Sequence, residues 1–260
     1  LSGYAAETNR DNFINTHVMD VILYRFIPQI AEQVRNAVRL QILKTLSAQP
    51  QADTLRWSVI AHSLGTSVTH DTLHAMYTQS GTAGPLPPSV TRSKVLAMIA
   101  NVSRVLETDA DVYTSVVRPD VNPAQGVCDY YLNARHEWDP IPVPKQFRPL
   151  DDWPNVETRR DNRYQSLLIN AIESKNVHDL LHYLKNPKVH IPLFRALTWQ
   201  GIIDDATAAT TSAQYEASTP IGEFQDWIAK LKKIWPSEQS GWRETIKTFR
   251  GFQDLLSKDA

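Results

Sequence analysis

One serine in the sequence lies where a catalytic nucleophile could stand. Ser63 follows the short apolar run Trp57–Ala61 and precedes Gly65, where a segment of helical pattern begins. At a tight turn from a buried strand into a helix, a serine hydroxyl is presented to solvent, and small residues two positions before and after it let the strand and the helix approach. Ala61 and Gly65 fill those two places. The pattern predicts Ser63 as the nucleophile and the backbone N–H of Leu64 as an oxyanion donor; the alternative is that Ser63 only caps the helix.

A serine nucleophile needs a histidine base and a carboxylate that orients the imidazole. In one class of α/β fold, in which each of these groups lies on a loop after a later strand, the acid follows the nucleophile in the chain and the histidine comes last. Asp139 follows the apolar run Tyr130–Ala134 and is the predicted acid, with Glu137 as the near alternative. His178, in a loop that leads into a helix, is the predicted base, and His182, one helical turn later, is the alternative base.

Two segments carry histidines four residues apart, His70 with His74 and His178 with His182, and each has an aspartate between them. Two histidines at this spacing on a helix can bind zinc, with a carboxylate between them as base. Aspartate is one carbon shorter than the usual glutamate, and the chain has no cluster of cysteine ligands. A zinc-dependent hydrolase is therefore the less favoured alternative, no metal is expected, and His70 and His74 are expected on the polar face of their helix.

The elements that must position these groups are short apolar runs that alternate with longer amphipathic segments. Strands are expected at 57–61, 95–100, 130–134 and 164–172, the last of which would also suit a helix. Helices are expected at 20–46, 66–77, 180–184 and 191–197, with two more between 221 and 256, a Gly- and Pro-rich loop at 80–89, and an irregular surface loop at 139–154.

The alternation of strands and helices predicts an α/β fold, a mostly parallel sheet covered by helices on both faces. We expect residues 1–200 to form the core of this fold. Residues 201–260 are expected to form a helical C-terminal extension packed on that core, rich in tryptophan.

Three segments carry a resemblance to a known family. The run 59–68 (VIAHSLGTSV) and the run 133–142 (NARHEWDPIP) resemble the nucleophile and acid segments of lipase-like and esterase-like α/β hydrolases. The run 177–184 (VHDLLHYL) is similar to their histidine segment. The resemblance spans residues from about 20 to 200. It implies hydrolysis of a small-molecule or lipid ester through an acyl-enzyme, without a cofactor, and an oxyanion hole completed by a loop after an early strand.

The N-terminal part of the chain departs from this family pattern. The early strands and the oxyanion loop of the family have no counterpart in residues 1–60. We expect either that the N-terminal portion of the fold is missing from this chain or that a second polypeptide supplies it. A hydrolase fold that has lost this loop could have lost its activity, so a catalytically inactive interaction domain is the alternative function.

Composition narrows the classes of function further. The 260 residues are 42% hydrophobic and 21% charged with a formal net charge of -1, and no basic stripe interrupts that balance, which argues against a nucleic-acid partner. Cys128 is the single cysteine, so no intramolecular disulfide can form. No apolar run is long enough to span a membrane, and the first residues do not resemble a signal peptide. A cytoplasmic location is favoured, while the compartment and the oligomeric state stay open.

Overall fold

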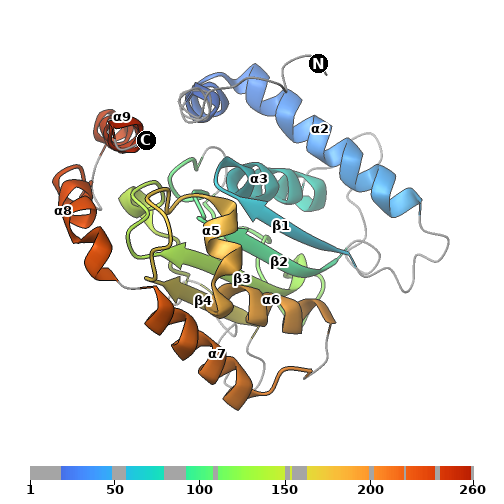
Figure 1. The fold of residues 1–260 in the computed structure, drawn as a ribbon. Coiled ribbons are helices and arrows are strands. Elements are labelled where there is room, and N and C mark those ends of the chain that lie inside the picture. The colour runs from blue at the N-terminus through green and yellow to red at the C-terminus, as the bar shows by residue number, and fades with distance from the viewer. Residues whose placement is uncertain are drawn as a thin grey trace.

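The computed structural model describes eight stretches of the chain and the single residue 153. The stretches are 19–48, 57–78, 92–107, 111–149, 163–198, 202–219, 221–237 and 241–258, with residue 153 standing between the fourth and the fifth. Four strands and seven α-helices are labelled along these stretches in Figure 1, and the short 3-10 helices η2 and η3 lie between them. Their bounds are α2 Pro28–Ser47, β1 Ser58–His62, α3 Leu64–Thr78, β2 Ser93–Ile99, β3 Cys128–His136, η2 Val143–Lys145, β4 Tyr164–Ile169, α5 Leu180–Lys185, α6 Pro187–Thr198, α7 Asp205–Ser218, η3 Ile221–Phe224, α8 Gln225–Lys233 and α9 Trp242–Lys258.

The four strands form one sheet in the order β1-β2-β3-β4, and every neighbouring pair is parallel. All residues of β2 are buried, as expected for an inner strand of a parallel sheet that is covered on both faces. Because the strands run in the same direction, their carboxyl ends meet at one edge of the sheet, where ligand and catalytic groups of such folds usually lie. The predicted α/β class with a parallel sheet flanked by helices is confirmed.

Helices cover the sheet on both faces. On one face, Leu73 and Met76 of α3 pack against Ala61, Leu96 and Met98 of the first two strands, and α2 lies outside α3. On the other face, α5 and α6 cover the middle and far strands, with Leu193 and Val189 of α6 among the buried contacts (Figure 1). The alternation of side chains along each strand therefore supplies two separate apolar layers.

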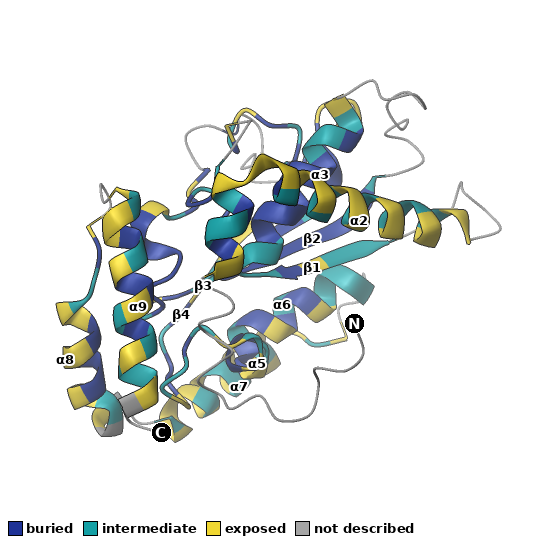
Figure 2. Ribbon diagram, turned by 90° about the horizontal axis from the view of Figure 1, so that it is seen from above, coloured by how far each residue is buried: buried dark blue, intermediate teal, exposed yellow. Residues whose placement is uncertain are grey.

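The C-terminal helices hold the loops at the carboxyl edge of the sheet. Trp227 of α8 and Phe252 of α9 belong to one apolar cluster with Val102, Ile141 and Val177, which follow β2, β3 and β4 respectively. Figure 2 shows the buried faces of both helices turned toward the body of the molecule. The loops that follow β2, β3 and β4 are thus held in place by contacts with α8 and α9.

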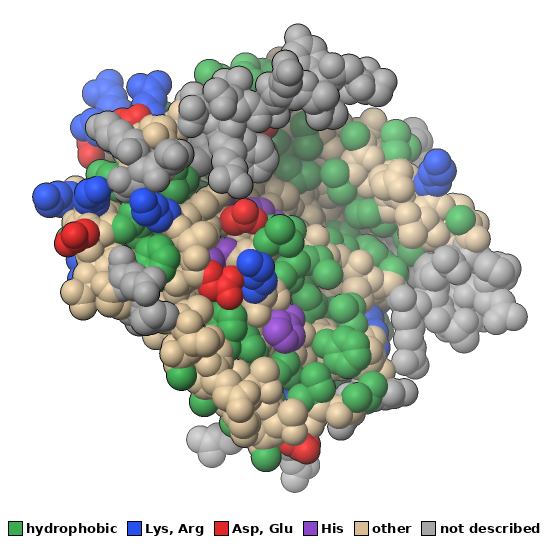
Figure 3. All heavy atoms as spheres, viewed as in Figure 1, with side chains coloured by type: hydrophobic (Ala, Val, Ile, Leu, Met, Phe, Trp, Pro, Cys, Tyr) green, Lys and Arg blue, Asp and Glu red, His purple; other side chains and the backbone are tan. Residues whose placement is uncertain are grey.

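The outer face of α8 is positively charged. Lys230, Lys232 and Lys233 are exposed on it, and Figure 3 shows lysine and arginine side chains gathered at that corner of the molecule. Lys232 also lies over the ring of Trp138, with its Nζ 5.1 Å from the ring centroid.

Among the described helices, none has both the length and the apolar character needed to cross a membrane.

Two predicted elements differ from those observed. The single helix expected from 20 to 46 is interrupted at Ile27, because Pro28 has no N–H to continue the preceding turn and instead occupies the first turn of α2. The loop expected to lie on the surface from 139 to 154 is mostly buried over its described residues, 139–149 and 153, since Ile141, Val143 and Phe147 pack inward. Residues 164–169 form a strand, so the helical alternative for that segment is wrong.

One predicted segment is not described by the structure, and one observed helix was not predicted. The Gly- and Pro-rich segment 80–89 lies outside the described residues. Helix α7 was not predicted, because it has no buried residue and hence no apolar stripe to reveal it. It begins at Asp204, whose carboxylate accepts a hydrogen bond from Thr207 N–H, the usual arrangement of a helix N-cap.

Candidate active site

Ser63 occupies a strained turn between β1 and α3. Its φ is 53°, in the left-handed region that a non-glycine residue rarely adopts. The turn is fixed on both sides, because Ser63 N–H donates to Ile99 O at 3.0 Å and Thr66 donates to Ser63 O from both its backbone and its hydroxyl. Strain of this kind, held in place by surrounding hydrogen bonds, is concentrated at functional sites in proteins.

The steric reason predicted for Gly65 is wrong. A Cβ built at Gly65 would meet no heavy atom within 4 Å, so the approach of β1 and α3 does not require glycine there. Ala61, by contrast, is buried among the core residues between strand and helix, where a larger side chain would have to displace them. The small residue before the serine is therefore explained by packing, and the glycine after it is not.

The three predicted triad residues lie in one hydrogen-bonded chain. His178 Nε2 is 2.7 Å from Ser63 Oγ, and His178 Nδ1 is 2.7 Å from Asp139 Oδ2. These residues are separated by 115 and 39 positions in the sequence, and each stands on a loop after a different strand. The structure therefore brings together a hydroxyl, an imidazole and a carboxylate in the geometry that nucleophilic catalysis by serine requires.

Asp139 is fully buried and accepts hydrogen bonds at both carboxylate oxygens. Ile141 N–H donates to Oδ1 at 3.0 Å, and the hydroxyl of Tyr183 donates to Oδ2 at 2.8 Å. Burial by itself would raise the pKa of Asp139, but the facing His178 and these donors together lower it below its ordinary value. The carboxylate is thus held ionised, in one orientation, behind the imidazole.

A further layer of contacts orients the acid. Tyr183 is completely buried, and its oxygen accepts the backbone N–H of His136 at 3.0 Å. The ring of His136 is itself fixed at both nitrogens, since Trp138 N–H donates to Nδ1 and Nε2 donates to Ala171 O. Burial lowers the pKa of His136 from 6.5 to about 4, which keeps this ring neutral at physiological pH.

His62 contributes to the position of the base and not to proton transfer from Ser63. Its Nε2 donates to the backbone carbonyl of His178 at 2.7 Å, and the two rings lie 5.0 Å apart between centroids. Burial, followed by the neighbouring His178, lowers the pKa of His62 from 6.5 to about 4. The ring of His62 therefore contacts the loop that carries His178 and has no hydrogen bond with Ser63 in the described residues.

The alternative acid and base lie elsewhere. His182 is on α5 with its ring 5.0 Å from that of His136, and within the described residues neither ring nitrogen has a hydrogen-bond partner. Glu137 is exposed, and its backbone N–H pairs with Ile169 O. Neither side chain forms a hydrogen bond in the chain that links Ser63 to Asp139.

The proposed oxyanion donor is at the first position of α3. The first N–H groups of a helix have no acceptor within the helix, and no hydrogen bond from Leu64 N–H is found to any described residue. This N–H is therefore available beside Ser63. A second donor cannot be assigned to any side chain of the described stretches.

The histidines of the two pairs have different partners among the described residues. His70 is buried against expectation, because α2 covers α3, and its Nδ1 lies 3.0 Å from Asp71 Oδ1. His74 Nδ1 pairs with Ser115 Oγ, while His178 and His182 face different surroundings. A search of the described stretches finds no group of three or more His, Cys, Asp or Glu side chains that could hold a metal ion.

Sequence reasoning missed Tyr183, His136 and Thr66 as supports of the site. Tyr183 lies within the quoted histidine segment, and its hydroxyl in an otherwise apolar helix was the available signal. Thr66 follows the nucleophile turn directly, where a hydroxyl can reach back to a free carbonyl. His136 had no local signal, because its role is made by contacts with residues far along the chain.

No family model, curated protein or solved structure matches this chain. The class of protein must therefore be argued from the parallel sheet and from the contacts of Ser63, His178 and Asp139.

Proposed function

We propose that this chain is a serine hydrolase of the α/β-hydrolase type, which cleaves carboxylic esters through an acyl-enzyme. The observation that carries the proposal is the continuous contact from Ser63 Oγ through His178 to Asp139, with both links at 2.7 Å. Two further observations support the same conclusion. Ser63 has a strained φ of 53°, and each of the three residues follows a different strand of the parallel sheet.

The first half of the reaction forms the acyl-enzyme. Because Asp139 is ionised, His178 presents its Nδ1–H to the carboxylate and its Nε2 lone pair to Ser63. Ser63 Oγ attacks the ester carbonyl carbon while Nε2 takes the hydroxyl proton. The tetrahedral oxyanion is stabilised by Leu64 N–H, and its collapse breaks the bond to the alcohol, which leaves with the proton from Nε2.

Water completes the cycle. A water molecule takes the place of the alcohol, gives its proton to His178 Nε2 and attacks the acyl carbon. The bond to Ser63 Oγ then breaks, Oγ recovers the proton, and the carboxylic acid is released. The substrate class we propose is a small-molecule or lipid ester, and none of these steps needs a cofactor.

The free edge of β1 is where the oxyanion hole could be completed. In the described residues β1 is an outer strand, its Ile60 side chain is 49% exposed, and it ends at His62 beside the nucleophile. A strand added at this edge would bring its own terminal loop next to Ser63. We propose that a further segment of the fold or a second chain supplies the second oxyanion donor at this edge.

A fluorophosphonate probe tests the proposal directly. Attack by an activated serine on phosphorus displaces fluoride and leaves a stable label, so we expect labelling at Ser63 that is lost in Ser63→Ala. Ser67→Ala is the matched control, because Ser67 lies on α3, which directly follows Ser63, is 1% exposed, and has no hydrogen bond at its hydroxyl within the described residues. Labelling that persists in Ser63→Ala would disprove the assignment, and a folded protein that takes no label would indicate an interaction domain without catalysis.

A further inference from the structure

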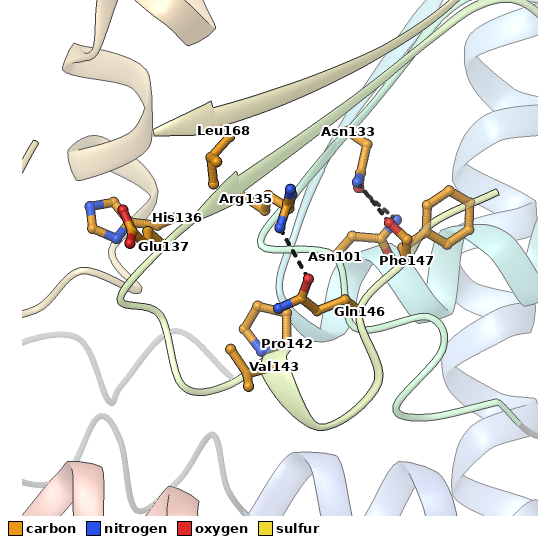
Figure 4. Close-up of a pocket in the computed structure, with 10 residues that line it drawn as sticks. All are labelled: Asn101, Asn133, Arg135, His136, Glu137, Pro142, Val143, Gln146, Phe147 and Leu168. Atoms are coloured by element: carbon orange, nitrogen blue, oxygen red, sulfur yellow. Dashed lines mark hydrogen bonds between the residues drawn. The ribbon is translucent and has the colours of Figure 1, made fainter. Parts of the chain in front are cut away.

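A pocket separate from the triad lies on the face of the sheet beside β3 and β4. It has a volume of about 230 Å³, and neither Ser63, His178 nor Asp139 lines it. Figure 4 shows Arg135 reaching from β3 into the space between Leu168 of β4 and Gln146 of the loop that follows the triad acid. The pocket therefore has walls from two strands and one loop, which are fixed by the fold.

The charge of Arg135 is balanced only in part, by the nearby carboxylate of Glu137. Within the described part of the chain it forms no ion pair, and its Nη1 donates to the neutral amide oxygen of Gln146 at 3.0 Å. The same oxygen also accepts from the guanidinium of Arg148, so two positive groups converge on one neutral acceptor. Burial, followed by the charge of Arg148, lowers the pKa of Arg135. An anion in the pocket would relieve both effects.

Apolar and polar side chains share the rest of the lining. Pro142, Val143, Phe147 and Leu168 supply the apolar part, and Leu168 is 43% exposed. The polar part consists of Asn101, Asn133, His136, Glu137 and Gln146. The space corresponds to about eight water molecules at roughly 30 Å³ each, which suits a ligand of similar size. A cation beside apolar side chains in a small pocket matches a molecule with one charged end and a short hydrocarbon end.

We propose that this pocket is a binding site for a small monocarboxylate with a short aliphatic chain. A guanidinium presents pairs of N–H donors in a fork that matches the two oxygens of a carboxylate, while the apolar walls take the hydrocarbon. Glu137, which also lines the pocket, repels a dianion such as phosphate more strongly than a monoanion. The site does not depend on Ser63, so it stands apart from the proposed hydrolysis.

Ligand-observed NMR titration tests the site in a Ser63→Ala background, in which no hydrolysis can intervene. We expect saturable binding of hexanoate with a dissociation constant in roughly the millimolar range, and weaker binding of 1-hexanol and of inorganic phosphate. Arg135→Gln should weaken hexanoate binding by about tenfold. Lys145→Gln is the matched control: it removes an exposed positive charge from the same loop without lining the pocket, and should leave the affinity nearly unchanged.

A second variant covers the case in which Arg135→Gln does not fold. Leu168→Trp narrows the pocket from a partly exposed strand position, and should weaken hexanoate binding while the circular dichroism spectrum stays that of the parent. No saturable hexanoate binding, equal binding in the folded Arg135→Gln or Leu168→Trp protein, or tighter binding of phosphate than of hexanoate would each overturn the proposal. Because labelling of Ser63 by fluorophosphonate is measured separately, either proposal can fail without the other.

Discussion

Replacing Tyr183 by phenylalanine tests whether the second layer of the site acts on catalysis. The change keeps the buried ring and removes two hydrogen bonds, the one that Tyr183 donates to Asp139 and the one that it accepts from His136 N–H. A hydrogen bond to a charged group contributes about 1.5–3 kcal/mol, and a buried N–H without an acceptor costs about 1–3 kcal/mol. We therefore expect the free energy of unfolding to fall by about 3 kcal/mol.

The same change should alter the pH dependence of activity in a predictable direction. Tyr183 is one of the groups that lower the pKa of Asp139, so the loss of its hydrogen bond raises that pKa. With one donor fewer, the carboxylate attracts the facing His178 more strongly. The protonated imidazole is then favoured, and the acid limb of kcat/KM for an activated aryl ester should move upward by about 0.5–1 pH unit. The maximal rate should fall about tenfold, because the carboxylate is held less firmly.

Tyr131→Phe is the matched control for this prediction. Tyr131 is as buried as Tyr183, and its oxygen accepts a hydrogen bond from Asn101 at 3.1 Å, but it has no contact with Asp139. It should lose stability without moving the pH profile. A Tyr183→Phe enzyme whose acid limb coincides with that of the parent would refute the reasoning, since a purely structural role would change stability alone.

Three further predictions concern strain, titration and the nucleophile turn. Ser63→Gly should be more stable than Ser63→Ala by about 1 kcal/mol in urea unfolding, because glycine adopts a φ of 53° without strain; equal stabilities would show that the turn is not strained. His136 stays neutral in the folded protein down to about pH 4, whereas the unfolded chain takes up a proton near 6.5, so stability should fall by roughly 3 kcal/mol as the pH decreases between these values. Urea unfolding of His136→Gln at both pH values should show a correspondingly smaller loss, and an identical loss would contradict the assignment. Thr66→Val should lower the free energy of unfolding by about 1–3 kcal/mol, because Val102 N–H loses its acceptor at 3.0 Å; an unchanged midpoint would indicate that the turn tolerates that loss.

The sequence order of the strands carried most of what could be predicted. A strand, a turn and a helix around Ser63, with Asp139 and His178 after later strands, follow from apolar runs and from the rule that parallel strands end at one edge. Local patterns are enough for such statements, since the strands contain short apolar runs, most clearly β2, which is buried on both faces. The break at Pro28 could also have been predicted, because proline imposes it locally.

The parts that could not be predicted depend on contacts between distant residues. Tyr183 is 44 positions from the carboxylate that it orients and 47 from the N–H that it accepts, so no local pattern links them. The burial of His70 depends on α2 packing over α3, which a hydrophobic pattern of α3 alone does not show. The explanation of Gly65 was wrong for a different reason. The motif suggested that a side chain would not fit at this position, but a Cβ at Gly65 would meet no heavy atom within 4 Å.

The direction of every proton in the site follows from backbone amides, which can only donate. Because His136 N–H donates to the Tyr183 oxygen, the Tyr183 hydrogen is left to point at Asp139 Oδ2, while Ile141 N–H occupies Oδ1. The carboxylate then acts only as an acceptor, so the hydrogen between it and His178 must belong to Nδ1. The neutral imidazole consequently carries its lone pair on Nε2, 2.7 Å from Ser63 Oγ, which is the tautomer that a general base requires. The polarity of the whole chain is set by the fold before any substrate binds.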